Sequence, residues 1–265
     1  MVTKDSRHQV ETETDPLVVH QACAELRFAE GLRRRSEEAR GEAAVQEASL
    51  LAWLEGARGN VNELRQMTMV PAAELKADPA DPALALTLGI WRAAWRLQSE
   101  LPMLNRGTGQ GDSRRPAPAV LGTLNRDVLS FMVQAGAVPL RDVAVPKDPA
   151  LMASVLRLAT SDDAPVLTRT AEVLRLMLTR PLFSQGNIAT AFLFAKWLLT
   201  TGGVEPTGVA LLSHHASQNL NEFAALRERG TPSDWQAFVA TSVVEGARAG
   251  AEIVRSVQAE RTLDL

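Results

Sequence analysis

The stretch from residue 174 to residue 199, LRLMLTRPLFSQGNIATAFLFAKWLL, decides the fold. Its two apolar halves predict two helices, and the proline and glycine between them predict a sharp turn, because both residues interrupt helices. The second half, Ile188–Leu199, is apolar nearly all round, which predicts a buried helix at the centre of the protein. Gly186 and Asn187 at its start predict a weak anion site, since free backbone N–H groups and the positive end of the helix dipole point outward there.

The remaining sequence predicts an all-α fold. An N-cap residue followed by proline, the signature of a helix start, recurs at Asp15-Pro16, Asp81-Pro82 and Thr231-Pro232. The polar residues 1–14 are expected to be disordered, and residues 15–265 to form a single helical domain. Within it we expect helices over 17–40, Glu42–Leu54 and Pro206–Arg229.

Two further elements are expected from local patterns. Trp91 and Trp95 are four residues apart on a predicted helix, so both should face the core. The segment Val138–Pro146 is short and partly β-branched, which predicts a β-hairpin or an extended flap.

Composition narrows the function classes. Apolar residues make up 46% and charged residues 22% of the 265 residues, as in ordinary globular proteins, and the net charge of −3 gives no sign of nucleic-acid binding. The single cysteine, Cys23, cannot form a disulfide within the chain and fits a reducing compartment. The N-terminus lacks the apolar core of a signal peptide, and no apolar stretch is long enough to span a membrane. We expect a cytoplasmic protein with neither nucleic acid nor membrane as partner.

The histidines do not predict a metal site. His214 and His215 are adjacent on a predicted helix, so their side chains point about 100° apart and do not easily share one metal. The nearest carboxylates in sequence, Glu205 and Glu222, lie more than one helical turn away. The chain also lacks a GxSxG elbow, a P-loop and a dinucleotide-binding fingerprint.

The turn resembles the core motif of the Fic (Fic/Doc) family, HPFx(D/E)GNGRxxR, whose members transfer nucleotide monophosphates to protein hydroxyls. Phe183, Gly186 and Asn187 match the motif, and Ser184 takes its variable place. Gln185 stands where the family has the Asp or Glu that holds magnesium. An amide is a poorer Mg²⁺ ligand than a carboxylate, so a magnesium site is not expected.

The residues that perform the family's chemistry are replaced. Pro181 falls at the position of the catalytic histidine or, with one residue inserted in the turn, Arg180 does. Neither accepts the proton of an attacking hydroxyl, because proline has no side-chain base and arginine stays protonated below a pKa of about 12. The two motif arginines are Ala189 and Phe192, which offer no charge to a phosphate. We therefore assign no catalytic residue and no metal ligand.

A second segment resembles the inhibitory helix of Fic proteins, (S/T)xxxE(G/N). In Leu51–Asn60, LAWLEGARGN, Glu55 and Gly56 fit this pattern, and Leu51 replaces the Ser or Thr. The resemblance implies a regulatory glutamate that pairs with a motif arginine, but the counterpart position here is Phe192. It covers roughly residues 42–229 and implies a Fic-like helical bundle, with the flap beside the motif. The high Ala, Arg and Leu content without tyrosine is typical of GC-rich genomes, such as those of actinobacteria.

Three functions remain open. The favoured hypothesis is a Fic-like protein that has lost nucleotidyl transfer and acts by binding a partner protein or a nucleotide. The others are an active Fic-type adenylyltransferase with an altered site and an unrelated helical interaction module. We expect no resident cofactor. ATP or another nucleotide would bind at around millimolar concentration, about −4 kcal/mol, and a homo-oligomer stays open.

Overall fold

The computed structural model describes residues 15–57, 60–70, 74–76, 78–101 and 115–260. All regular secondary structure in these residues is helical and none is strand, which confirms the all-α fold. The segment 1–14, expected to be disordered, lies outside the described residues.

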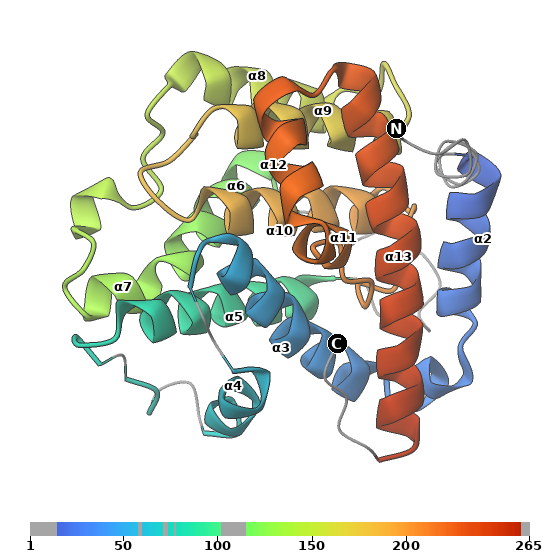
Figure 1. The fold of residues 1–265 in the computed structure, drawn as a ribbon, viewed down its shortest axis with the longest axis horizontal. Coiled ribbons are helices and arrows are strands. Elements are labelled where there is room, and N and C mark those ends of the chain that lie inside the picture. Colours follow the sequence, from blue (N-terminus) through green and yellow to red (C-terminus); the bar gives the residue numbers. More distant parts are fainter. Residues whose placement is uncertain (1–14, 58–59, 71–73, 77, 102–114, 261–265) are drawn as a thin grey trace.

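The described chain forms a succession of α-helices interrupted by two short 3₁₀ helices, η1 (Glu30–Arg33) and η2 (Leu140–Asp142) (Figure 1). In chain order the α-helices are α2 (Pro16–Arg27), α3 (Ser36–Leu54), α4 (Val61–Met67), α5 (Pro82–Glu100), α6 (Ala117–Val128), α7 (Ser130–Gln134), α8 (Pro149–Thr160), α9 (Val166–Thr179), α10 (Asn187–Thr201), α11 (His214–Gln218), α12 (Leu220–Arg229) and α13 (Pro232–Gln258).

The predicted start signals begin helices in the structure. The side chain of Asp15 accepts a hydrogen bond from the N–H of Leu17 at 2.9 Å, and Asp81 caps α5 in the same way. At the start of α13, Thr231 and Asp234 form a reciprocal capping box, in which each side chain bonds the other's backbone. These caps satisfy N–H groups that have no partner within the helix.

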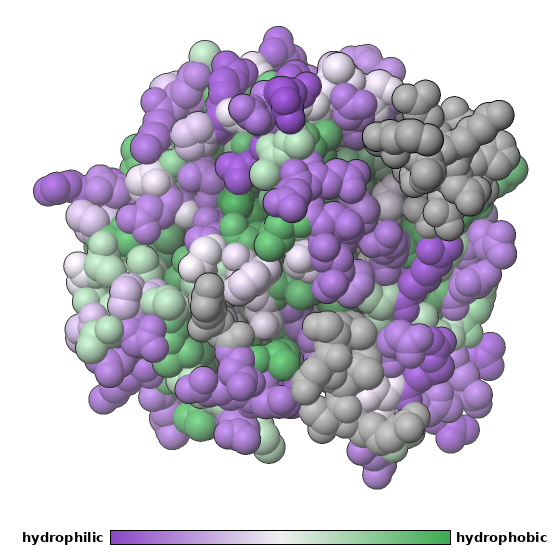
Figure 2. Space-filling model, in the orientation of Figure 1, coloured by the Kyte–Doolittle hydropathy of each residue, from purple (hydrophilic) through white to green (hydrophobic). Residues whose placement is uncertain are grey.

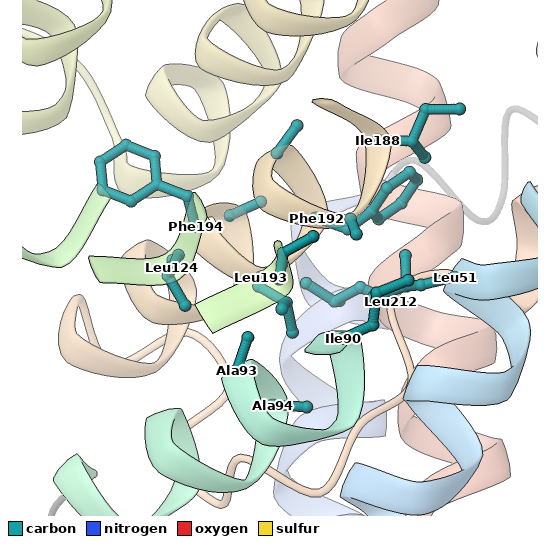
Figure 3. Packing of buried hydrophobic residues seen from close by; sticks show 14 of the residues in the cluster. Leu51, Ile90, Ala93, Ala94, Leu124, Ile188, Phe192, Leu193, Phe194 and Leu212 are labelled. Atoms are coloured by element: carbon teal, nitrogen blue, oxygen red, sulfur yellow. The ribbon is translucent and has the colours of Figure 1, made fainter. Parts of the chain in front are cut away.

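Helix α10 forms the centre of the fold, as its apolar pattern predicts. It runs across the middle of the molecule and contacts α3, α5, α6 and α9 (Figure 1). Phe192, Leu193 and Phe194 are almost completely buried and point to different sides of the helix, with Leu193 directed towards α5 (Figure 3). On the face shown in Figure 2, hydrophobic residues are visible mainly near the centre, and hydrophilic residues cover most of the border.

The prediction of a single helix over residues 17–40 is wrong. Helix α2 ends at Arg27, η1 follows, and α3 then runs without a break through the residues expected to separate two helices. Both α2 and η1 pack against α13, and at Gly31 the approach is so close that a Cβ atom would lie 2.7 Å from Cγ1 of Val254. The local helical pattern carries no sign of this tertiary contact.

The long helix expected from Pro206 is also wrong, because α11 and α12 are preceded by an irregular segment over 202–213. The buried carboxylate of Glu205 accepts hydrogen bonds from the N–H groups of Thr207 at 3.0 Å and Gly208 at 2.9 Å. Gly208 has a φ of 72°, which favours glycine. A residue in this left-handed conformation does not continue a right-handed helix, so the chain is not helical here.

Two smaller expectations fail. The segment Val138–Pro146 forms η2 and a turn with Ala144 at a φ of 56°, and it contains no hairpin. Trp91 is 7% exposed as expected, but Trp95 is 47% exposed. Its ring lies at the surface over Gly41 of α3, where the absent side chain leaves room for it.

Candidate functional site

The turn between α9 and α10 is closed by the side chain of Asn187. Its Oδ1 accepts a hydrogen bond from the N–H of Phe183 at 2.8 Å, and its Nδ2 donates to the carbonyl of Phe183 at 3.1 Å. Phe183 is completely buried and anchors the turn in the core. The motif residues Phe183 and Asn187 thus shape the loop that precedes α10.

The turn is also held from α6. The buried side chain of Asn125 donates hydrogen bonds to the carbonyl of Gln185 at 3.1 Å and to Oγ1 of Thr190 at 3.3 Å. Its Oδ1 accepts from the N–H of Ala144 at 2.9 Å. One amide therefore joins the turn, the first residues of α10 and the segment expected to be a flap.

Gly186 is required at the helix start for two separate reasons. Its φ of 68° is a left-handed conformation, and a Cβ atom there would lie 2.7 Å from Cγ1 of Val128. Glycine adopts this conformation without a steric penalty, and any other residue would require the Val128 side chain to shift.

We expect Gly186→Ala to destabilise the protein more than Gly203→Ala does. Gly203 has a φ of 79° but no atom near its Cβ position, so its substitution causes only left-handed strain, about 1–2 kcal/mol. Gly186→Ala adds the clash with Val128, about 1–3 kcal/mol more. Urea unfolding of both variants measures the difference, and equal losses would show that Val128 moves aside freely.

The other predicted residues of the turn lie at its surface. Arg180, Pro181 and Gln185 are exposed, and Ser184 is partly buried. The hydroxyl of Ser184 donates to the carbonyl of Asp142 at 3.2 Å, so the segment around η2 packs directly on the turn. This group contains no histidine and no carboxylate side chain, and its chemistry offers neither a general base nor a strong magnesium ligand.

Glu55, more than a hundred residues away in sequence, meets the start of α10. Oε1 of Glu55 accepts a hydrogen bond from the N–H of Ala189 at 3.0 Å. Glu55 is the C-cap of α3, and Gly56 follows it with a φ of 85°, which lets the chain leave the helix. The structure thus brings the glutamate of the inhibitory-like segment to the Gly186-Asn187 helix start. The N–H group expected to bind an anion already has a partner.

The surroundings of Glu55 act on its proton affinity in opposite directions. Burial raises the pKa of Glu55, while hydrogen bonds from the backbone of Ala189 and Ile188 and the positive charge of Arg227 lower it. Burial is the largest effect, and the pKa lies above its ordinary value. Burial thus destabilises the ionised form of the Glu55 carboxyl group, while the hydrogen bond from Ala189 stabilises it.

Arg227 is a site residue that the sequence analysis missed. It lies on α12, where its Nε donates to the carbonyl of Leu178 at 3.2 Å and its guanidinium lies 5.7 Å from the ring centre of Phe223. Its charge acts on Glu55 at the start of α10, where the motif positions for arginine hold Ala189 and Phe192. No local pattern marks Arg227, since only the fold brings α12 to this place.

A second buried charged group lies deeper in α10. Nζ of Lys196 is 3.5 Å from Oε2 of Glu47 on α3, and both side chains are almost fully buried. Oε1 of Glu47 also accepts a hydrogen bond from the N–H of Ser213 at 3.1 Å. This pair ties α3, α10 and the 202–213 segment together.

The remaining candidate groups are placed as follows. Cys23 is buried, and burial together with the charge of Glu205 raises the pKa of its thiol to about 12. Nδ1 of His215 lies 3.0 Å from Oε2 of Glu245. Within the described ranges, no group of three or more His, Cys, Asp or Glu side chains is arranged to hold a metal ion. No helix in this part of the chain has the length and apolar character needed to cross a membrane.

Comparison with known proteins gives no assignment. No protein-family model matches the chain, and no curated protein matches it. The Fic-like interpretation therefore depends on the residues of the turn and on the position of Glu55.

Proposed function

We propose that this is a Fic-like protein that acts by binding and carries out no nucleotidyl transfer, and that its own Glu55 carboxyl group fills the anion site. The observation that carries this proposal is the 3.0 Å hydrogen bond from the Ala189 N–H to Glu55. It places an acidic side chain where a phosphate would accept the same bond at the start of α10.

The side chains around this position support binding without transfer. Transfer to a hydroxyl needs a base, and the exposed Arg180 and Pro181 do not supply one. Gln185 replaces a magnesium-binding carboxylate, so a nucleotide would lack the metal that neutralises its phosphates. Arg227 supplies the positive charge that remains near the start of α10.

The ligand class that fits the site is a phosphate-bearing nucleotide, and its binding requires Glu55 to withdraw. In the wild type, ATP has to displace the Glu55 carboxyl group, so binding at millimolar strength or weaker is expected, about −4 kcal/mol. A partner protein that moves the end of α3 would expose the same N–H group.

Glu55→Ala is expected to bind ATP roughly tenfold more tightly than the wild type, because it frees the Ala189 N–H and removes a repelling charge. The gain should not depend on Mg²⁺, because Gln185 offers no carboxylate. Isothermal titration calorimetry with ATP, with and without Mg²⁺, measures it. Glu63→Ala, which removes an exposed carboxylate from neighbouring α4, should bind like the wild type.

A labelling experiment, together with this calorimetry, separates the alternatives. With labelled ATP, GTP, UTP or CTP, Glu55→Gly should show no self-labelling above the wild type, and a clear gain would support the active adenylyltransferase instead. If Glu55→Ala binds no nucleotide at any concentration, the remaining interpretation is a helical interaction module.

Glu55→Gln is expected to become more stable relative to the wild type as the pH rises. Because the pKa of folded Glu55 lies above its ordinary value of 4.5, the stability that its proton provides is fully present below that value. It is lost as the pH rises through the raised pKa. Glutamine keeps an acceptor oxygen for the Ala189 N–H and does not titrate. Urea unfolding of both proteins between about pH 4 and about pH 7 measures the difference, and a constant difference would contradict the raised pKa.

A further inference from the structure

A groove of about 450 Å³ lies between α12 and α13, with α11 contributing to one wall. This volume is in the range of sites that bind small molecules. Its lining combines apolar side chains, including Leu226 and Phe238, with several ionisable ones. Glu55 and the turn before α10 are not among its lining residues, so it is a separate site.

Acidic groups outnumber basic ones in this groove. Glu222, Asp234 and Glu245 contribute three carboxyl groups, and Arg229 contributes one guanidinium. Hydrogen bonds from Thr231 lower the pKa of Asp234, which keeps it ionised at neutral pH. The Nε of Arg229 also lies 3.8 Å from Glu228, which is not part of the lining, so its charge is already partly balanced. The groove is therefore suited to a positively charged ligand.

The inner carboxyl group, that of Glu245, is held in position by the buried side chain of His215. Oε2 of Glu245 lies 3.0 Å from Nδ1 of His215, and Nδ2 of Asn219 lies 3.3 Å from the same nitrogen. The imidazole ring packs 5.4 Å from the ring centre of Phe238. His215 is buried, so its ring and the carboxyl group that it contacts are fixed before any ligand arrives. Such fixed groups lose little freedom on binding, which favours affinity.

We propose that this groove binds a small organic cation with an aliphatic stem and a primary ammonium group. The carboxyl groups of Glu222 and Glu245 would accept hydrogen bonds from the ammonium, and Leu226 and Phe238 would contact the stem. The apolar side chains of Leu226 and Phe238 beside the carboxyl groups favour an organic cation over a metal ion. Ammonium–carboxylate hydrogen bonds are among the stronger ones, which gives the site selectivity for charge.

The test uses 1,4-diaminobutane as the probe and the full chain. Calorimetry should show saturable binding of the diamine and none of 1-butanol or butyrate, which keep the stem but lack the positive charge. Glu245→Gln and Glu222→Gln should each weaken binding roughly tenfold, the loss of one charged hydrogen bond. Glu252→Gln is the control, because it removes an exposed carboxylate from α13 outside the groove, whose partner Arg255 does not line the groove either, and it should leave the affinity unchanged.

Three results would overturn the proposal: no saturable binding of the diamine, equal binding of butyrate, or equal weakening by Glu252→Gln and Glu222→Gln. Glu222 is exposed, so its substitution tests the groove even if Glu245→Gln disturbs folding through His215. Circular dichroism identifies that case. Because Glu55 and α10 are unchanged in all three variants, failure here is independent of the proposed nucleotide site.

Discussion

Phe192→Ala is expected to lower the free energy of unfolding by about 3–5 kcal/mol, because it leaves a cavity at the centre of the fold. Phe192 is 1% exposed and lies among the buried hydrophobic residues of Figure 3. The centre of its ring is 5.9 Å from that of Phe223 on α12. Urea unfolding measures the loss. The matched control is Phe28→Ala, the same change at a residue that is 70% exposed, which should stay within about 0.5 kcal/mol of the wild type. Wild-type stability of Phe192→Ala would contradict the central position of α10.

Glu47→Ala is expected to cost about 3–5 kcal/mol, because it leaves the charge of Lys196 buried without its partner. It also removes the acceptor for the Ser213 N–H. The double variant Glu47→Leu, Lys196→Met replaces the pair by apolar side chains and should be more stable than Glu47→Ala. Urea unfolding of both variants tests this, and a double variant as unstable as Glu47→Ala would show that the loss does not come from the unpaired charge of Lys196.

The centre of the fold could be predicted from sequence because its signal is local. The apolar run Ile188–Leu199 is long enough to indicate a buried helix, and the Asp-Pro and Thr-Pro pairs mark helix starts through contacts within three residues. The breaks in the chain could not be predicted from helical periodicity. At Gly31 the chain approaches α13, which is distant in sequence. At Glu205 the hydrogen bonds are local, to Gly208 among others, but a charged residue gives no sign in the sequence that it will be buried and bind its own backbone.

The candidate site could likewise be predicted only in the parts that leave a local pattern in the sequence. The Gly-Asn turn and the Glu-Gly helix end are both visible in the sequence, and the resemblance suggested that they belong together. Arg227 and the partner of Lys196 carry no such signal, since each acts on a residue far away in the chain. Trp95 shows the same limit, because helical spacing gives a shared side of the helix and not its burial.

Because Glu55 belongs to the same chain as α10, its carboxyl group binds the N–H of Ala189 as an intramolecular ligand. The carboxyl group and the N–H group both belong to helix ends: Glu55 is the C-cap of α3, and Ala189 lies in the first turn of α10. Even a short flexible linker gives a tethered group an effective concentration of about millimolar, and two fixed helix ends hold it closer still. A free phosphate group would therefore have to displace the Glu55 carboxyl group, which is present at this high effective concentration, and not only water. Under the proposed function, a scarce nucleotide would leave the Ala189 N–H bonded to Glu55, whereas a partner protein that moves the end of α3 would free this N–H without competing for it.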